Sequence, residues 1–285
     1  MICHVICLSK FYNYICLLFL FSSLLVSPVG AQSLTFVELN CENLFDYDDD
    51  GGKDDAEYLP DATRHWTRKR YWQKLNNIAQ ELLSCTDHDI PDLMALCEVE
   101  NDSVVNSLVH RSLLRNADYD YVMTQSPDFR GIDVALLYRP SSFSLINSYS
   151  LRIQPVENMR PTRDILYACG RIVSGDTLHV FVIHAPSRYG AERYSQPFRQ
   201  AVIDRLCQSI DSLQVLSYDA MILVAGDFND GNDSPVLQHL SRHRLHNMTG
   251  DAQGQNGVLG TYRYQGEWEH IDHIFGSRPI YNKVD

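Results

Sequence analysis

The chain has 285 residues, of which 24 are Lys or Arg and 36 are Asp or Glu, so its formal net charge at pH 7 is −12. Its 45% apolar and 21% charged residues are typical of a soluble globular protein and argue against a disordered chain, a collagen-like repeat or a multi-span membrane protein. No repeat with a period of about 20 to 50 residues is visible, which argues against a solenoid.

The first 31 residues have the pattern of a secretory signal peptide. Lys10 precedes an apolar run at residues 14–26, Pro28 follows, and small residues at 29–31 precede Gln32. This pattern predicts export to the periplasm or the extracellular space, with cleavage after residue 31. A single membrane anchor is the alternative, but the run is shorter than the roughly 20 residues that a span needs. We therefore expect a mature chain without stable membrane association.

The cysteines do not predict a disulfide framework or a structural zinc motif, because none of the eight forms a CxxC pair. Three of them lie in the predicted signal peptide, which leaves an odd number in the mature chain. Disulfides are therefore not expected to be the main stabilising feature of the mature chain. The eight are Cys3, Cys7, Cys16, Cys41, Cys85, Cys97, Cys169 and Cys207.

The acidic surplus is concentrated at residues 46–61, which hold eight acids and one lysine. Such a segment is either a cation site or, more often, a solvated loop. A basic strip follows directly: Arg64, Arg68, Lys69, Arg70 and Lys74. The charge balance therefore does not exclude nucleic acid as a partner, but it argues against tight binding without a metal ion.

The first part of the mature chain is predicted to alternate strands and helices. Residues 34–39 form a strand that leads into a polar loop at 40–45. Thr67 can cap a helix whose apolar positions recur every three or four residues between Tyr71 and Leu83. Residues 91–99 are nearly all apolar, as in strands covered on both faces.

The rest of the chain is predicted to be rich in strands. After a helix at about 102–114, strand-length stretches occupy 119–124, 133–138, 144–152, 165–173 and 178–184. A long helix at about 191–216 leads into a buried strand at 220–225, a short helix near 235–240, a loop to residue 260 and a last strand at 271–275. No linker divides residues 32–285, so we expect one domain, an α/β sandwich of two mixed sheets with helices outside.

Polar residues gather where the predicted strands end, as ligand-binding groups do in open α/β folds. Carboxylates dominate this set, and oxygen-rich sets without cysteine suit Mg²⁺ or Mn²⁺. A lone carboxylate at such a position is more often a cap or an ion-pair partner. The set is Asn40, Glu42, Glu98, Asp133, His184, Asp227, Asn229 and Asp272.

Six segments in chain order resemble the successive motifs of the endonuclease/exonuclease/phosphatase superfamily: LNCENLF, LMALCEVEN, RGIDVALLYRP, FVIHAPSR, ILVAGDFND and GEWEHIDHIF. Each segment alone is a weak indicator of the superfamily, but six of them in the same order, over residues 35–276, are a specific one. The resemblance implies a four-layer α/β sandwich and metal-dependent hydrolysis of a phosphodiester, with a nucleic acid as the expected substrate and a monomer as the expected form.

The resemblance also implies a metal site and a base. Glu98 would be the main metal carboxylate, and Asn40 and Glu42 would complete the set of ligands directly or through water. Asp227 matches the acid that holds and deprotonates the attacking water, and Asn229 matches the amide that positions phosphate or water.

Three further residues have roles implied by the same resemblance. His184 would donate a hydrogen bond to a phosphoryl oxygen or act as the general acid, since histidine titrates near neutrality. Asp133 would orient His184. Asp272 resembles the acid that orients a second histidine.

That second histidine is where the chain departs from the family pattern, in which it lies in a Ser-Asp-His-x-Pro segment. No such segment occurs here, and His273 cannot replace it, because neighbouring strand residues point to opposite faces. The domain is therefore expected to be truncated or to lack this residue. The sequence does not place His239, His243, His246 or His270.

Two other functions remain open at this stage. One is a phosphatase or a phospholipid head-group phosphodiesterase of the same superfamily. The other is a catalytically dead binding module, which the missing histidine favours.

Overall fold

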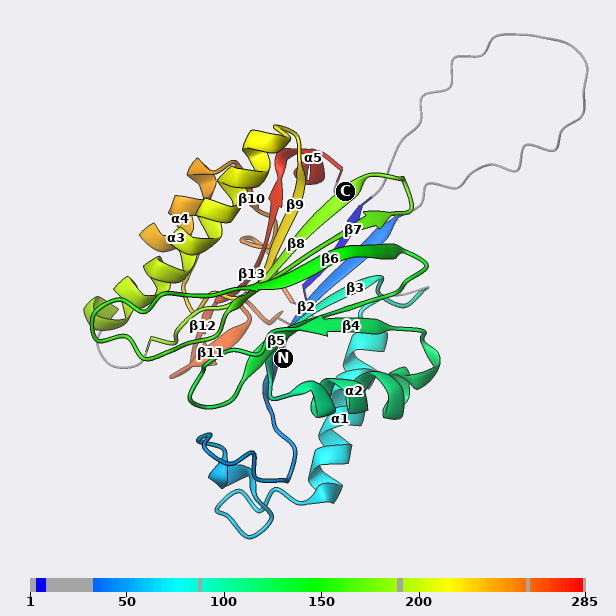
Figure 1. Ribbon diagram of the computed structural model, residues 1–285, viewed down its shortest axis with the longest axis vertical. Coiled ribbons are helices and arrows are strands. Elements are labelled where there is room, and N and C mark those ends of the chain that lie inside the picture. Colours follow the sequence, from blue (N-terminus) through cyan, green and yellow to red (C-terminus); the bar gives the residue numbers. More distant parts are fainter. Residues whose placement is uncertain (1–3, 9–32, 87–88, 189–191, 255–256, 284–285) are drawn as a thin grey trace, which may run out of the picture.

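The computed structural model describes residues 4–8, 33–86, 89–188, 192–254 and 257–283. Two β-sheets pack face to face, and helices cover both outer faces (Figure 1). The predicted α/β sandwich of two mixed sheets with flanking helices is confirmed.

The first sheet contains five strands in the order β1-β2-β3-β5-β4. β2 and β3 run parallel, whereas the other neighbours are antiparallel. The strands are β1 (His4–Leu8), β2 (Leu34–Leu44), β3 (Leu93–Val99), β4 (Asp120–Met123) and β5 (Asp133–Tyr138).

The second sheet contains six strands in the order β10-β13-β9-β8-β7-β6, with β8 and β9 parallel. Its strands are β6 (Phe143–Leu151), β7 (Ile165–Ile172), β8 (Thr177–His184), β9 (Met221–Asp227), β10 (Leu245–Asn247) and β13 (Asp272–Ser277).

The helices lie where the sequence predicts them. α1 (Arg68–Leu83) and α2 (Asp102–Arg111) cover the first sheet, and α3 (Glu192–Leu216) and α4 (Pro235–Arg242) cover the second (Figure 1). Thr67 is the residue before α1, as predicted, but its side chain makes no capping hydrogen bond.

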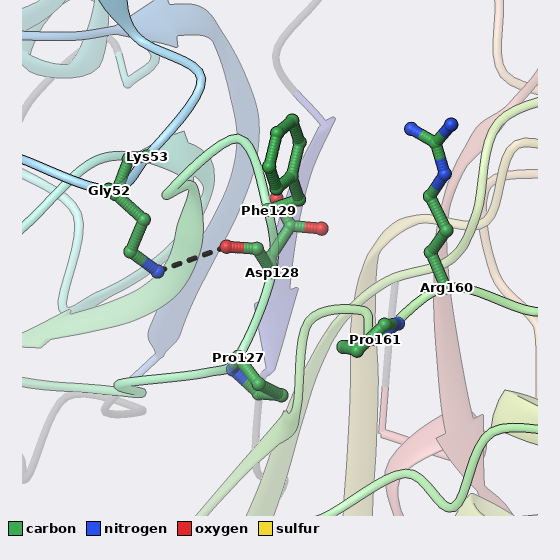
Figure 2. A pocket seen from close by; sticks show the side chains of 7 residues that line it. All are labelled: Gly52, Lys53, Pro127, Asp128, Phe129, Arg160 and Pro161. Atoms are coloured by element: carbon green, nitrogen blue, oxygen red, sulfur yellow. Dashed lines mark hydrogen bonds between the residues drawn. The ribbon is translucent and has the colours of Figure 1, made fainter.

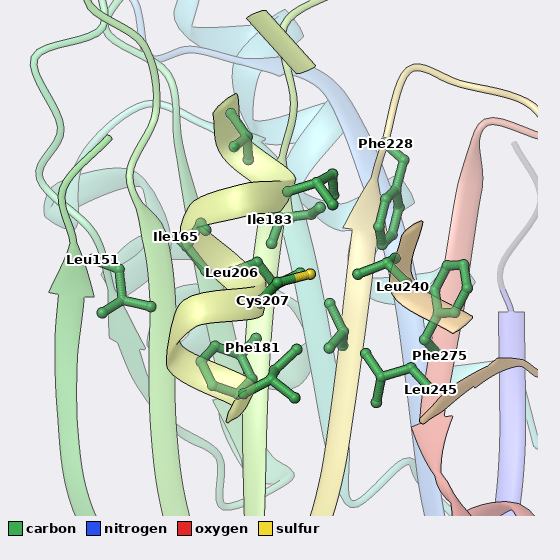
Figure 3. Packing of buried hydrophobic residues seen from close by; sticks show 14 of the residues in the cluster. Leu151, Ile165, Phe181, Ile183, Leu206, Cys207, Phe228, Leu240, Leu245 and Phe275 are labelled. Atoms are coloured by element: carbon green, nitrogen blue, oxygen red, sulfur yellow. The ribbon is translucent and has the colours of Figure 1, made fainter. Parts of the chain in front are cut away.

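Three apolar layers hold the sandwich together. One lies between the sheets and one between the first sheet and α1 and α2. The third lies between the second sheet and the α3–α4 pair (Figure 3). β3, β5, β8 and β9 are buried almost throughout, which explains their continuous apolar runs.

Short elements near the carboxyl end were not predicted. Besides β10, they are the hairpin of β11 (Tyr262–Tyr264) and β12 (Glu267–Glu269) and the helix α5 (Arg278–Tyr281).

Two single 3₁₀ turns lie earlier in the chain, η1 (Ala56–Tyr58) and η2 (Leu113–Asn116). Runs of three or four residues carry too little periodicity to identify from sequence.

Most of the predicted signal peptide, residues 1–3 and 9–31, lies outside the described residues. Within it, β1 pairs antiparallel with β2 at the edge of the first sheet. No helix among the described residues is long and apolar enough to cross a membrane.

Candidate active site

The site lies at one end of the sandwich, where strands of both sheets terminate. β8 and β9 end side by side with His184 opposite Asp227, and Asp227 is also opposite Asp272 of β13. In the other sheet, Asn40 of β2 is opposite Cys97 of β3, one residue before Glu98. The topology thus brings together residues that are up to 232 positions apart, from 40 to 272.

Glu98 is aimed into the site by an irregularity in its strand. The pairing of β3 with β5 shifts register between Cys97 and Val99, so the residue between them is an extra one. Glu98 accordingly has a left-handed backbone with φ of 60°. Bulges redirect side chains in this way and are common beside active sites.

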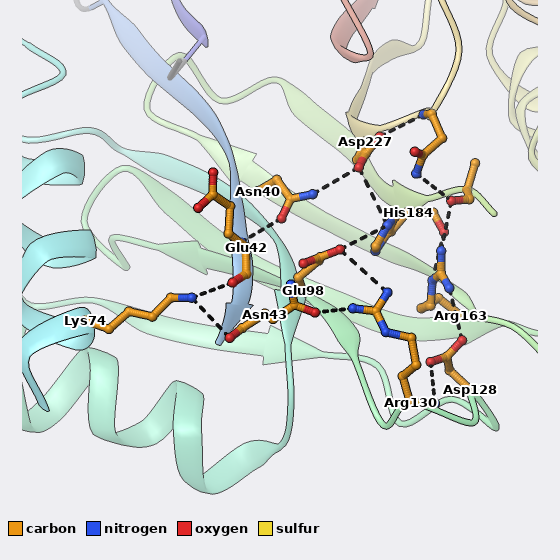
Figure 4. A network of polar contacts seen from close by, with 12 residues as sticks. Asn40, Glu42, Asn43, Lys74, Glu98, Asp128, Arg130, Arg163, His184 and Asp227 are labelled. Atoms are coloured by element: carbon orange, nitrogen blue, oxygen red, sulfur yellow. Dashed lines mark hydrogen bonds and ion pairs between the residues drawn. The ribbon is translucent and has the colours of Figure 1, made fainter. Parts of the chain in front are cut away.

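Glu98, His184 and Asp227 meet at the centre of the site (Figure 4). His184 Nε2 lies 3.8 Å from Glu98 Oε1 and 3.7 Å from Asp227 Oδ2. Carboxylate oxygens only accept hydrogen bonds, so this placement favours the neutral imidazole with its proton on Nε2. Burial lowers the pKa of His184 well below its usual range, and Arg163 and Arg130 add to the effect.

Both aspartates at the site have a raised pKa. Burial is the largest cause for both, and the pKa of Asp272 rises to about 6. The charge of Asp272 raises the pKa of Asp227 further, and Glu98 raises both. These two buried aspartates and the Glu98 side chain, which is 12% exposed, form a set of carboxylate oxygens that a divalent cation would stabilise. The residues present therefore fit a Mg²⁺ or Mn²⁺ ion.

Both oxygens of Asp227 are held in place. Oδ1 accepts from the Asn229 backbone N–H at 2.7 Å, and Oδ2 accepts from Asn40 Nδ2 at 3.0 Å. The Asn229 side chain donates to the Ala185 carbonyl at 3.0 Å and so ties the end of β9 to the end of β8. Asn40 reaches across from the other sheet, so the amide of the first sheet orients the acid of the second.

Two arginines belong to the site although the sequence did not identify them (Figure 4). Arg130 lies 3.8 Å from Glu98 Oε1 and also donates to the Asn43 side chain. Buried Arg163 donates to the carbonyls of His184 and Ala185 and pairs with Asp128 at 3.1 Å. The only sequence signal was their place in polar segments that precede strands.

Glu38 is another residue that the sequence did not identify. It lies two positions before Asn40 on the same face of β2, it is fully buried, and among the described residues neither of its carboxyl oxygens has a hydrogen-bond partner. Burial raises its pKa well above the usual value, and the charges of Asp272 and Asp227 raise it further. It was missed because it sits inside an apolar strand.

The structure corrects the expectation that Asp133 orients His184. Its carboxylate instead accepts hydrogen bonds from the Thr124 hydroxyl and from the Ser126 N–H at 3.1 Å. Nδ1 of His184 has no hydrogen-bond partner in the part of the chain that the structure describes. Asp133 therefore fixes the turn between β4 and β5 and does not hold the imidazole.

Glu42 and His273 also lie away from the centre. Glu42 is exposed, and only its backbone takes part in the network, where its carbonyl accepts from Lys74. His273 is fully buried on the opposite face of β13, beside the ring of Phe228 and with Nε2 3.0 Å from the Asp230 carbonyl. The expectation that His273 cannot join Asp272 in the site agrees with this placement.

Three side chains of the basic strip after the acidic segment make contacts within the chain. Arg64 pairs with Glu57 at 2.9 Å, Arg70 donates to backbone carbonyls, and Lys74 donates to the turn after Asn40. The acidic segment is anchored by buried Asp55, which accepts from the Asp50 N–H. Arg64, Arg70 and Lys74 therefore help to hold this loop, whereas Arg68 and Lys69 are exposed.

An open pocket of about 620 Å³ adjoins the site (Figure 2). Asp128 forms part of its wall, and Lys53 Nζ donates to the Asp128 carbonyl at 3.0 Å. Phe129, which is 53% exposed, and exposed Arg160 also line it. Arg130, beside Phe129, continues from this wall to Glu98.

The model of the Endonuclease/Exonuclease/phosphatase family matches residues 35–284. Solved structures with a similar fold include an endonuclease/exonuclease/phosphatase family protein from Bacteroides thetaiotaomicron, at 18% identity and a TM-score of 0.61 over 87% of this chain and 84% of that chain. The human Nocturnin catalytic domain matches at 22% identity and a TM-score of 0.55 over 73% and 74%. The Bacteroides thetaiotaomicron mannosyl-6-phosphatase Bt3783 matches at 17% and 0.57 over 86% and 85%. No curated protein matches by sequence.

Proposed function

Because the chain belongs to the endonuclease/exonuclease/phosphatase family, we propose that it is a divalent-metal-dependent phosphodiester hydrolase that acts on nucleic acid. The observation that carries the proposal is the meeting of Glu98, His184 and Asp227 from three strands of two sheets, with His184 Nε2 within 3.8 Å of both carboxylates. Such a constellation has an acceptor for a proton, a donor for an oxyanion and ligands for a hard cation.

Glu98 and Asn40 are the residues that would hold Mg²⁺ or Mn²⁺. When bound, the cation supplies charge withdrawal from a phosphoryl oxygen. Arg130 lies 3.8 Å from Glu98 Oε1, the same oxygen that faces His184.

Asp227 is the base that takes the proton of the attacking water. Its two oxygens are already fixed by the Asn229 N–H and the Asn40 amide, so the carboxylate loses little freedom when a water binds. Burial, together with the charges of Asp272 and Glu98, raises the pKa of Asp227 above its usual value, and a carboxylate with a raised pKa is a stronger base.

His184 donates its Nε2 proton to a non-bridging phosphoryl oxygen. Because burial lowers the pKa of His184, the side chain is neutral at neutral pH and acts as a hydrogen-bond donor, not as an imidazolium acid. Arg163 donates hydrogen bonds to the backbone carbonyls of His184 and Ala185, so the position of the imidazole ring is fixed. Such a donor stabilises charge that grows in the transition state.

The pocket beside the site supports a nucleic acid as the substrate. Exposed Phe129 offers a ring on which a base can stack, and Lys53 and Arg160 line the same pocket and can neutralise phosphates. A base-bearing phosphodiester would thus be held on one side while its phosphate lies against Glu98 and His184.

A second candidate is a phosphatase that acts on a small phosphate ester. The net charge of −12 and the contacts that Arg64, Arg70 and Lys74 make within the chain favour it, because a long polyanion would be repelled. The similar fold of a mannosyl-6-phosphatase is in keeping with this alternative.

The test is a substrate panel with matched metal conditions. Purified protein is incubated with plasmid DNA, RNA, a chromogenic phosphodiester, a sugar phosphate and a phospholipid, each with Mg²⁺, Mn²⁺ or EDTA. We expect metal-dependent cleavage of a nucleic acid, and an increase in KM with little change in kcat for Phe129→Ala. Hydrolysis of the sugar phosphate alone would favour the second candidate, and no hydrolysis with any metal would contradict both.

Export is part of the proposal and has its own test. The apolar run at 14–26 and the small residues at 29–31 support it. Intact mass of the protein recovered outside the cytoplasm should show a chain that begins at Gln32. A cell-retained chain that keeps residues 1–31 would contradict export.

A further inference from the structure

A second group of metal-ligating side chains lies on the outer face of the second sheet, between α3 and α4. Cys207 belongs to α3, His239 belongs to α4 and His243 is the residue that ends α4. Their ligating atoms all lie within 4.8 Å of one another. None of these residues takes part in the site at the strand ends.

The spacing of these residues along the helices places them on facing surfaces. Asp204, Cys207 and Asp211 are three and four positions apart and share one face of α3, while His239 and His243 are one turn apart. Figure 3 shows the Cys207 sulfur directed away from the axis of α3 toward Leu240 of α4.

The separation of the two imidazole nitrogens is that of a tetrahedral zinc site. His239 Nε2 and His243 Nε2 are 3.3 Å apart. Two nitrogens that each bind zinc at about 2.0–2.1 Å in a tetrahedron are also about 3.3 Å apart. Asp204 Oδ1 lies 3.8 Å from His239 Nε2 and is close enough to approach the same ion.

We propose that Cys207, His239 and His243 bind one Zn²⁺ ion, with Asp204 as the fourth ligand. A set of one sulfur, two imidazole nitrogens and one carboxylate suits zinc and excludes Mg²⁺, which prefers oxygen ligands alone. The ion joins α3 to α4.

The surroundings orient one of the ligands. His243 Nδ1 lies 2.6 Å from Asp211 Oδ1, which leaves Nε2 for the metal. A carboxylate behind a ligating histidine fixes its tautomer and ring orientation in many zinc sites. Gln214 donates to the His243 carbonyl at 2.8 Å and holds the end of α4 against α3.

Zinc binding must release the thiol proton of Cys207, because the thiolate is the ligand. The side chain is 3% exposed, and burial raises the pKa of its thiol to about 12. Each Zn²⁺ that binds near neutral pH should therefore transfer one proton from the sulfur to the buffer. The number of protons released can be measured by calorimetry in buffers of different ionisation enthalpy.

The ion would be structural and not catalytic. α4 begins a few residues after Asn229, so a link between α4 and α3 holds the segment that follows the end of β9. Binding to the folded chain should raise Tm, while turnover at the other site with saturating Mg²⁺ should stay unchanged.

The experiment uses Co²⁺ as a spectroscopic substitute for Zn²⁺. Purified protein is treated with a chelator and titrated with Co²⁺ in the presence of excess Mg²⁺. Zn²⁺ is then added to displace the bound Co²⁺. We expect one equivalent of Co²⁺ with visible bands of four-coordinate geometry and a thiolate-to-cobalt charge-transfer band, which the oxygen ligands near Glu98 cannot produce.

Matched variants assign the bands to these residues. Cys207→Ser should abolish the charge-transfer band, and His239→Gln should weaken Zn²⁺ binding by at least about 100-fold. The controls Cys169→Ser and His110→Gln should leave both unchanged. His239 is partly exposed, so its variant is expected to fold even if the core position Cys207 tolerates change poorly. Absence of a thiolate band in the wild-type protein, or equal Zn²⁺ affinity in wild type and His239→Gln, would overturn the proposal.

Discussion

The two clusters of metal-ligating side chains differ in both chemistry and construction. The site at the strand ends offers carboxylates and an amide, which come from strands of two sheets and from residues as distant as 40 and 272. The cluster of Cys207, His239 and His243 offers sulfur and nitrogen, with the Asp204 carboxylate beside it, from two helices between which β9 lies in the chain. Hard and borderline cations should therefore separate between them. Each site should also tolerate the loss of the other.

The largest effect is expected from Asp227→Asn. The amide keeps the shape of the side chain but cannot take the proton of the attacking water, so kcat should fall by roughly 10²- to 10⁴-fold. Steady-state kinetics on the best substrate of the panel measures it, with Asp211→Asn at the other cluster as the matched control. A kcat for Asp227→Asn close to that of the control would remove Asp227 as the base.

A large loss of stability is expected from Arg163→Met. The ion pair of Arg163 with Asp128 is 8% and 6% exposed, and removal of one partner of a buried pair costs about 3–5 kcal/mol because the other charge stays buried. Urea unfolding gives this difference. The exposed pair of Arg64 with Glu57 provides the control, for which Arg64→Met should cost less than about 1 kcal/mol.

The same variant separates the two clusters. Arg163 holds the backbone at the end of β8, and its hydrogen bonds and ion pair go to His184, Ala185 and Asp128, outside α3 and α4. Folded Arg163→Met should therefore lose activity but keep the cobalt–thiolate band. Loss of both in a folded protein would show that the clusters depend on each other.

The sequence predicted the sandwich because its buried strands are long apolar runs and its helices have regular apolar spacing. It also predicted that Glu98, His184, Asp227 and Asp272 lie at strand ends, and the sheet topology brings His184, Asp227 and Asp272 side by side. Arg130 and Arg163 escaped prediction, since their partners are distant carbonyls and carboxylates that no local pattern indicates. Cys207 and His239 were also missed, because the packing of α3 on α4 cannot be read from either helix alone.

A smaller effect should distinguish the clusters by metal. Glu98→Gln removes the charge of the main oxygen ligand, so Mg²⁺ affinity should fall by at least about tenfold, or about 1.4 kcal/mol. Isothermal titration measures it on the folded variant. The reciprocal variant Cys207→Ser should bind Mg²⁺ like the wild type, and unchanged Mg²⁺ affinity in Glu98→Gln would place the ion elsewhere.

The smallest effect is expected from Glu42→Gln, although the family resemblance includes Glu42 among the metal ligands. The side chain is exposed, and the structure uses the backbone of this residue, whose N–H donates to Asn40 Oδ1 at 2.9 Å and whose carbonyl accepts from Lys74. These contacts survive the substitution, and an exposed charge is screened by water and salt. We therefore expect Mg²⁺ affinity and kcat within about threefold of the wild type at about 0.15 M salt, since about 0.65 kcal/mol corresponds to that factor. Titration and kinetics of Glu42→Gln beside Glu98→Gln decide the point, and a loss as large as that of Glu98→Gln would show that the Glu42 carboxylate turns inward when the metal binds.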